Sequence, residues 1–110
     1  MSTEIEAGGL IVFDPSDKRA ITFNWDDALD TDVEINSSNW TITAVKQADI
    51  GASLTKDNEA VADDNRSTVV RLLATTASLG DIYIVNNKVT TNETPAQEFE
   101  QSFRVLVQNR

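Results

Sequence analysis

Apolar and polar residues alternate along several short stretches of the chain, and this alternation predicts β-strands. In "AITFNW" the apolar residues are Ile21, Phe23 and Trp25. Side chains two positions apart lie on the same face of a strand, so this spacing predicts a strand with one buried face. The stretch "NWTITAV" repeats the pattern, and we expect Trp40 and Ile42 to share its buried face.

The second half of the chain contains the longest alternating stretches. In "LGDIYIVNNKVTT" the residues Tyr83 and Val85 fall on one face, and in "EFEQSFRVLVQ" Phe103 and Val105 do the same. Both stretches contain valine and aromatic residues, as is usual in strands. Further strands are predicted at Gly9–Phe13, Ala52–Thr55 and Ser67–Thr76.

Two stretches deserve separate interpretation because their signals are mixed or weak. A helix is the alternative for "STVVRLLATTASL", since Leu72, Leu73 and the alanines raise helix propensity. Its threonine and valine content and its neighbours favour a strand. The stretch "KDNEAVADDN", residues 56–65, is polar enough to predict a loop.

The number and spacing of the strands predict an all-β protein. Roughly seven strands in one chain are the number expected of a single immunoglobulin-like β-sandwich. A length of 110 residues fits one domain, which we assign to residues 1–110, with 1–8 as a flexible N-terminal arm. The chain has no cysteine. The two sheets would therefore be held together by packing alone, without an intersheet disulfide.

The predicted core follows from the faces assigned above. A tyrosine after a Gly-Asp turn, near the start of a late strand, is typical of such sandwiches. Its ring packs inward and its hydroxyl binds nearby backbone, so we expect Tyr83 to be structural. The residues expected to form the structural core are Phe23, Trp25, Trp40, Ile42, Tyr83, Val85, Phe103 and Val105.

The charge balance limits the possible partners. There are 18 acidic and 9 basic residues, which give a net charge of −9. This charge repels the phosphate backbone of nucleic acids and the anionic surface of membranes, so we expect neither as a partner. It suits a basic partner surface, although a solvated surface that resists self-association explains it as well.

The absence of histidine and cysteine removes most familiar catalytic groups. We therefore expect no enzymatic activity, no cofactor and no metal. One alternative stays open for the stretch "DDALDTDVE", residues 26–34, because closely spaced carboxylates are ligands that calcium prefers. The stretch lacks the spacing and the glycine of an EF-hand loop, which favours a solvated turn.

The two tryptophans suggest an alternative from another class of function. An exposed indole offers a flat apolar face on which a sugar ring can stack, as in carbohydrate-binding modules. Trp25 and Trp40 each share a strand face with other apolar residues, which favours burial instead.

Two long stretches resemble a known family. They are "DPSDKRAITFNWDDALDTDVEINSSNWTI" and "GDIYIVNNKVTTNETPAQEFEQSFRVLV", and together they cover about Asp14 to Val107. This order of motifs is similar to that of small tailed-bacteriophage virion proteins of immunoglobulin-like fold, described as fibre-tail adaptor or accessory proteins. Two positions depart from the pattern: Ala28 stands where a second tryptophan is usual, and "NETPAQ" replaces a Gly-Arg turn. The positions that match are Phe23, Trp25, Leu29, Trp40, Tyr83, Val85, Asn87, Val89, Thr90, Thr91, Ser102 and Phe103.

The resemblance implies a structural protein of the virion that docks onto tail or tail-fibre proteins and is present in several copies. A capsid decoration protein on the head shell is the alternative that it leaves open. The start of the chain has no signal-peptide pattern, so we expect synthesis in the cytoplasm of the bacterial host. An unpaired edge strand could bind the partner through its main chain. The candidate edges are Gly9–Phe13 and Phe103–Val107.

Overall fold

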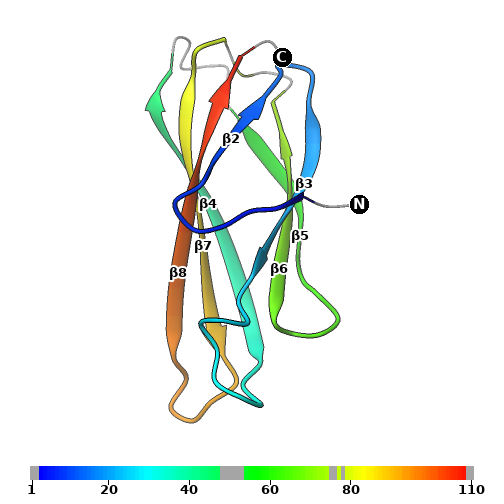
Figure 1. Cartoon of the computed structure of the whole chain (residues 1–110), viewed down its shortest axis with the longest axis vertical. Helices are drawn as coiled ribbons and strands as arrows, with labels where there is room; N and C mark the ends of the chain where they lie inside the picture. Colours follow the sequence, from blue (N-terminus) through cyan, green and yellow to red (C-terminus); the bar gives the residue numbers. More distant parts are fainter. Residues whose placement is uncertain (1–2, 48–53, 75–76, 78, 109–110) are drawn as a thin grey trace.

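The protein is a sandwich of two four-stranded sheets (Figure 1). The computed structural model describes residues 3–47, 54–74, 77 and 79–108. The first sheet has the order β1 (Thr3–Glu4), β3 (Lys18–Asn24), β6 (Ser67–Leu73) and β5 (Thr55–Val61). The second sheet has the order β2 (Leu10–Phe13), β8 (Glu98–Val107), β7 (Ile82–Thr91) and β4 (Ile35–Lys46).

This strand order confirms the predicted immunoglobulin-like β-sandwich, with eight strands instead of about seven. The N-terminal segment crosses from one sheet to the other. Its first strand, β1, pairs in parallel with β3, and its second, β2, pairs in parallel with β8. Thr3–Glu4 therefore belongs to a sheet, although the sequence suggests a flexible arm for residues 1–8.

The composition of the polar stretch 56–65 predicts a loop, but this prediction is wrong for most of the stretch. Most of it forms β5 at the edge of the first sheet. Its partner β6 supplies the backbone hydrogen bonds, and Arg71 of β6 binds Asp57 across the pair at 2.6 Å. The register shifts between Asp57 and Ala60, where Asn58 takes a left-handed φ of 53°. An edge strand has one neighbour and little buried surface, so it tolerates this polar composition.

The helical alternative for 67–79 is wrong over β6, which is a central strand of the first sheet. Alternate residues of β6, including Val70 and Leu72, are fully buried between the sheets. Residues 75–76, at the end of the strand predicted at Ser67–Thr76, lie outside the described part of the chain, as do 52–53 of the strand predicted at Ala52–Thr55.

Four aromatic rings fill the centre of the sandwich. Phe23 stacks on Trp40 with ring centroids 5.5 Å apart and planes at 4°. It meets Trp25 and Phe103 edge to face, at 6.1 Å and 5.4 Å. Phe23 lies on β3, whereas Trp40 and Phe103 lie on β4 and β8, so these contacts join the two sheets.

A buried polar network also joins the sheets. The missing disulfide suggested that packing alone holds them together, and this network corrects that expectation. Trp25 Nε1 donates to both Thr68 Oγ1 and Asn87 Oδ1 at 3.1 Å, and the Thr68 hydroxyl donates to the same Asn87 oxygen. Asn87 Nδ2 then donates to Ser38 Oγ at 2.9 Å and to the carbonyl of Asn39 at 3.2 Å. Thr68 is on β6 and Asn87 on β7, so the network crosses the core.

Candidate docking surface

The outer face of the second sheet carries an apolar groove. Leu10, Ile82, Ile84 and Leu106 line it, with Arg104 in the middle of the set. The strand register explains the arrangement. Leu10 of β2 lies opposite Arg104 of β8, which lies opposite Ile84 of β7, and Leu106 lies opposite Ile82. We call these five residues the apolar patch.

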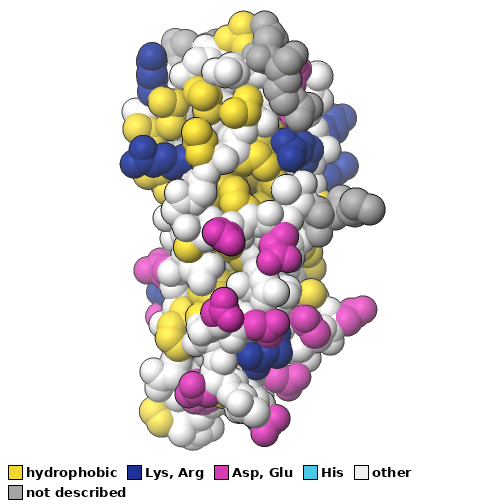
Figure 2. All heavy atoms as spheres, in the orientation of Figure 1, with side chains coloured by type: hydrophobic (Ala, Val, Ile, Leu, Met, Phe, Trp, Pro, Cys, Tyr) yellow, Lys and Arg dark blue, Asp and Glu magenta, His cyan; other side chains and the backbone are white. Residues whose placement is uncertain are grey.

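The large apolar side chains that are well exposed in the described part of the chain gather at the end of the second sheet where the apolar patch lies. They are Leu10, Val45 and Leu79, with 61%, 56% and 54% of their surface exposed. Val45 lies beside Lys46, the partner of Ile82, and Leu79 comes shortly before β7 begins. Figure 2 shows hydrophobic side chains gathered in the upper half of the molecule, over β2 and β8. Such clustering is a common mark of a binding surface.

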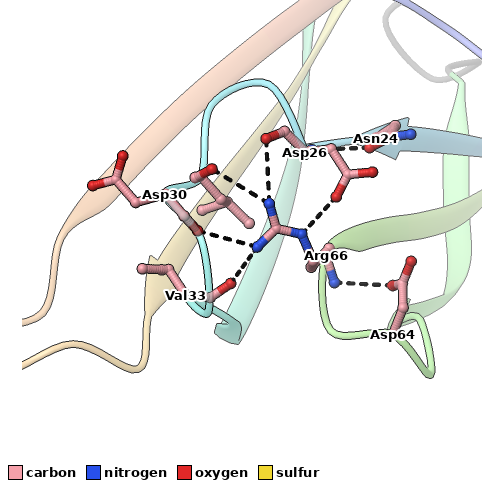
Figure 3. Close-up of polar contacts among 7 residues, drawn as sticks. Asn24, Asp26, Asp30, Val33, Asp64 and Arg66 are labelled. Atoms are coloured by element: carbon pink, nitrogen blue, oxygen red, sulfur yellow. Dashed lines mark hydrogen bonds and ion pairs between the residues drawn. The ribbon is translucent and has the colours of Figure 1, made fainter.

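The opposite end of the sandwich is acidic, as the lower half of Figure 2 shows. It is formed by the connections 25–34, 62–66 and 92–97, which meet at one end of the sheets (Figure 1). One arginine organises the first of these connections (Figure 3). Arg66 donates to Asp26 Oδ1 and to the carbonyl oxygens of Asp26, Leu29, Asp30 and Val33, at 2.5–3.3 Å.

These contacts argue against the alternative that the loop 26–34 binds a calcium ion. Four carbonyl oxygens that could coordinate a cation already accept hydrogen bonds from the Arg66 guanidinium. In the described residues, which include the whole loop, no three acidic side chains come close enough together to hold a metal ion. The guanidinium thus supplies the positive charge at the centre of the loop.

Replacing Arg66 with methionine is expected to lower the free energy of unfolding by about 1–2 kcal/mol, because several charge-assisted hydrogen bonds to loop carbonyls are lost at a partly exposed site. Arg66→Lys should recover less than half of this, since one ammonium group cannot span the same carbonyls. Urea denaturation measures both effects. The matched control is Lys88→Met, which breaks the exposed pair with Glu98 and should cost under about 0.5 kcal/mol. Equal losses for Arg66→Met and Lys88→Met would contradict the proposed role of Arg66.

Tyr83 lies inside the sandwich, but its hydroxyl donates to a side chain. The acceptor is Asp81 Oδ2 at 2.7 Å, and the backbone of Leu54 also hydrogen-bonds to this hydroxyl, as the sequence pattern suggests. Tyr83 and Asp81 are each 1% exposed. Burial, followed by the hydrogen bond and the charge of Asp81, raises the pKa of Tyr83 to about 12.

Tyr83 is the single tyrosine of the chain, so its ionisation can be followed by ultraviolet absorbance. We expect a midpoint near pH 12 in the folded protein and near 10 in urea. Because folding raises the pKa of Tyr83, the contribution of its protonated hydroxyl to stability is complete below pH 10. This contribution is lost as the pH rises through 12. A folded-state midpoint near 10 would show that the hydroxyl is exposed to water.

The predicted core residues, Tyr83 included, lie inside the sandwich. Seven of the eight are at most 1% exposed, and Ile42 is partly buried against the core. Trp25 and Trp40 are among the most buried, so neither indole offers the exposed face on which the carbohydrate alternative depends.

The predicted edges are corrected in part. β8 lies between β2 and β7, and β2 covers it over Arg104–Val107, so this part of β8 is not a free edge. β2 is an edge strand, but its accessible side is partly blocked. The carbonyl of Val12 accepts a hydrogen bond from Arg19 Nη1 at 3.3 Å.

Sequence reasoning did not single out the apolar patch or Arg66. A signal for the patch was present, because "LIVF", "IYIV" and "VLV" are continuous apolar runs, which place apolar residues on both faces of a strand. No comparable signal marks Arg66, whose acceptors are mostly backbone carbonyls more than 30 positions away in the chain.

The chain is an immunoglobulin-like sandwich with an apolar patch on one outer face, and exposed apolar patches commonly mark protein-binding surfaces. A family model described as "Podophage GP4 fiber-tail adaptor protein gp77" matches residues 14–106. The chain therefore belongs to this family of phage fibre-tail adaptor proteins, which confirms the resemblance seen in the sequence.

Two further comparisons concern curated sequences and solved structures. No curated protein sequence matches the chain. Among solved structures, the cysteine protease inhibitor EhICP2 from Entamoeba histolytica is similar, with a TM-score of 0.53 and 8% identity. The match covers 93% of this chain and 88% of that one. At this identity the likeness supports the fold alone. The described residues include no helix with the length and hydropathy needed to cross a membrane.

Proposed function

We propose that the chain is a non-enzymatic structural component of a phage virion that connects tail and tail-fibre proteins. The family match over residues 14–106 carries this proposal, because it names a structural adaptor. The exposed apolar side chains at one end of the second sheet support it, since an adaptor needs a surface on which another protein can dock. We expect several copies in each particle, synthesis in the host cytoplasm, and no nucleic acid or membrane partner.

The proposal is tested by deleting the gene from the phage that encodes the chain and supplying the protein from a plasmid. Particles made without the protein should carry heads and tails but lack attached fibres, and the plasmid should restore the fibres. Electron microscopy of the complemented particles should show the sandwich at the tail. Density over the head shell would favour the decoration alternative, and absence from purified particles would exclude any virion role.

A further inference from the structure

The apolar patch has an unusual charge at its centre. Arg104 is exposed, and the residues beside it on the neighbouring strands are Leu10 and Ile84, both apolar. Among the described residues, no acidic side chain forms an ion pair with Arg104. Most other described basic residues do have such a partner: the paired ones are Arg19, Lys56, Arg66, Arg71 and Lys88. Lys18 and Lys46 are the other described basic residues outside these ion pairs.

An occupant that covers the apolar patch must also satisfy this guanidinium. A purely apolar occupant would bury the charge without a partner, which is strongly unfavourable. A carboxylate can accept two parallel hydrogen bonds from the guanidinium, while the aliphatic side chains around it exclude water and strengthen the pair. The chemistry of the patch is therefore that of a carboxylate surrounded by apolar groups.

We propose that the apolar patch binds a segment of another virion protein that presents aliphatic side chains around one aspartate or glutamate, whose carboxylate pairs with Arg104. This inference rests on the proposed adaptor function and names the surface and the partner chemistry. A second copy of the chain is a poorer occupant, because two chains of net charge −9 repel each other.

The test measures binding of the fluorescently labelled protein to purified particles that the encoding phage assembles without it. Arg104→Glu should weaken binding at least tenfold, because it places two carboxylates face to face. Arg104→Met keeps the apolar stem and should still weaken binding severalfold. Leu10→Ser should also weaken it, and because Leu10 is 61% exposed its effect on folding is small. Thermal melts establish that each variant is folded.

The matched control is Lys18→Glu, which makes the same change in net charge at an exposed position on β3 of the other sheet. Its binding should equal that of the unchanged protein. Tighter binding of Arg104→Met would contradict the pairing of a partner carboxylate with Arg104. Unchanged binding of both Arg104→Glu and Leu10→Ser would show that the apolar patch is not the docking surface, while leaving the adaptor function intact. Failure of the unchanged protein to bind would overturn the proposed function itself. If sedimentation experiments showed that the protein self-associates and that Leu10→Ser prevents this, the occupant of the apolar patch would be a second copy of the chain.

Discussion

Replacing Phe23 with alanine is expected to lower the free energy of unfolding by about 4 kcal/mol, the usual cost of removing a fully buried aromatic ring. Phe23 is 0% exposed and contacts three other aromatic rings from both sheets. The cavity left behind cannot close easily, since the rings around it are held by strands on both sides. A domain of this size has roughly 5–15 kcal/mol of stability in total, so the variant should be close to unfolding at 37 °C.

Urea denaturation followed by circular dichroism measures this loss. Leu10→Ala is the matched control, because Leu10 is a large apolar residue that is already 61% exposed. It should change the free energy of unfolding by less than about 0.5 kcal/mol. If Phe23→Ala cost less than about 1 kcal/mol, the aromatic cluster would not be the packed centre of the fold.

Asn87→Ala is expected to cost about 2–4 kcal/mol, because the change removes hydrogen bonds to four groups and leaves the buried hydroxyl of Thr68 without its acceptor. Asn87 is 0% exposed. Its oxygen accepts from Trp25 and Thr68, and its amide donates to Ser38 and the carbonyl of Asn39. The loss reaches groups on both sheets at once, so the network takes over part of the role that a disulfide has in related sandwiches.

The neighbouring residue provides the control for this prediction. Asn86 points to the outer face of the same strand, where its amide binds Glu100 at an exposed site. Asn86→Ala should therefore cost less than about 0.5 kcal/mol. Thermal melts of the two variants compare them directly. Similar melting temperatures would mean that water replaces the lost bonds of Asn87, and the network would then not be a dry connection.

The central strands were predictable because burial of one face imposes a period of two on the sequence. β3 and β7 show this period clearly, with Phe23 on one and Tyr83 and Val85 on the other. β5 was not predictable, because an edge strand obtains its hydrogen bonds from β6 and needs few apolar residues of its own. Its stabilising contact, the pair between Asp57 and Arg71, depends on a register that the sequence does not display.

The candidate site was less predictable than the core. Burial of Trp25 follows from its strand pattern, but the acceptors of its indole nitrogen, Thr68 and Asn87, lie 43 and 62 positions away. That Arg104 has no acidic partner among the described residues likewise depends on three neighbouring strands and not on its own segment. Local sequence patterns can indicate which face is apolar, whereas the partners of a charge depend on the topology of the whole fold.

The parallel pairing of β2 with β8 determines how the sandwich responds to mechanical force. β2 lies close to the N-terminus and β8 close to the C-terminus, and both run in the same direction. Opposite pulls on the two ends slide one strand along the other, so their evenly spaced hydrogen bonds are strained together and not in succession. A single-molecule pull on both ends should show one abrupt rupture, and gradual extension at low force would contradict this expectation. In the proposed adaptor role, this geometry would hold the connection under tension until the whole strand slips.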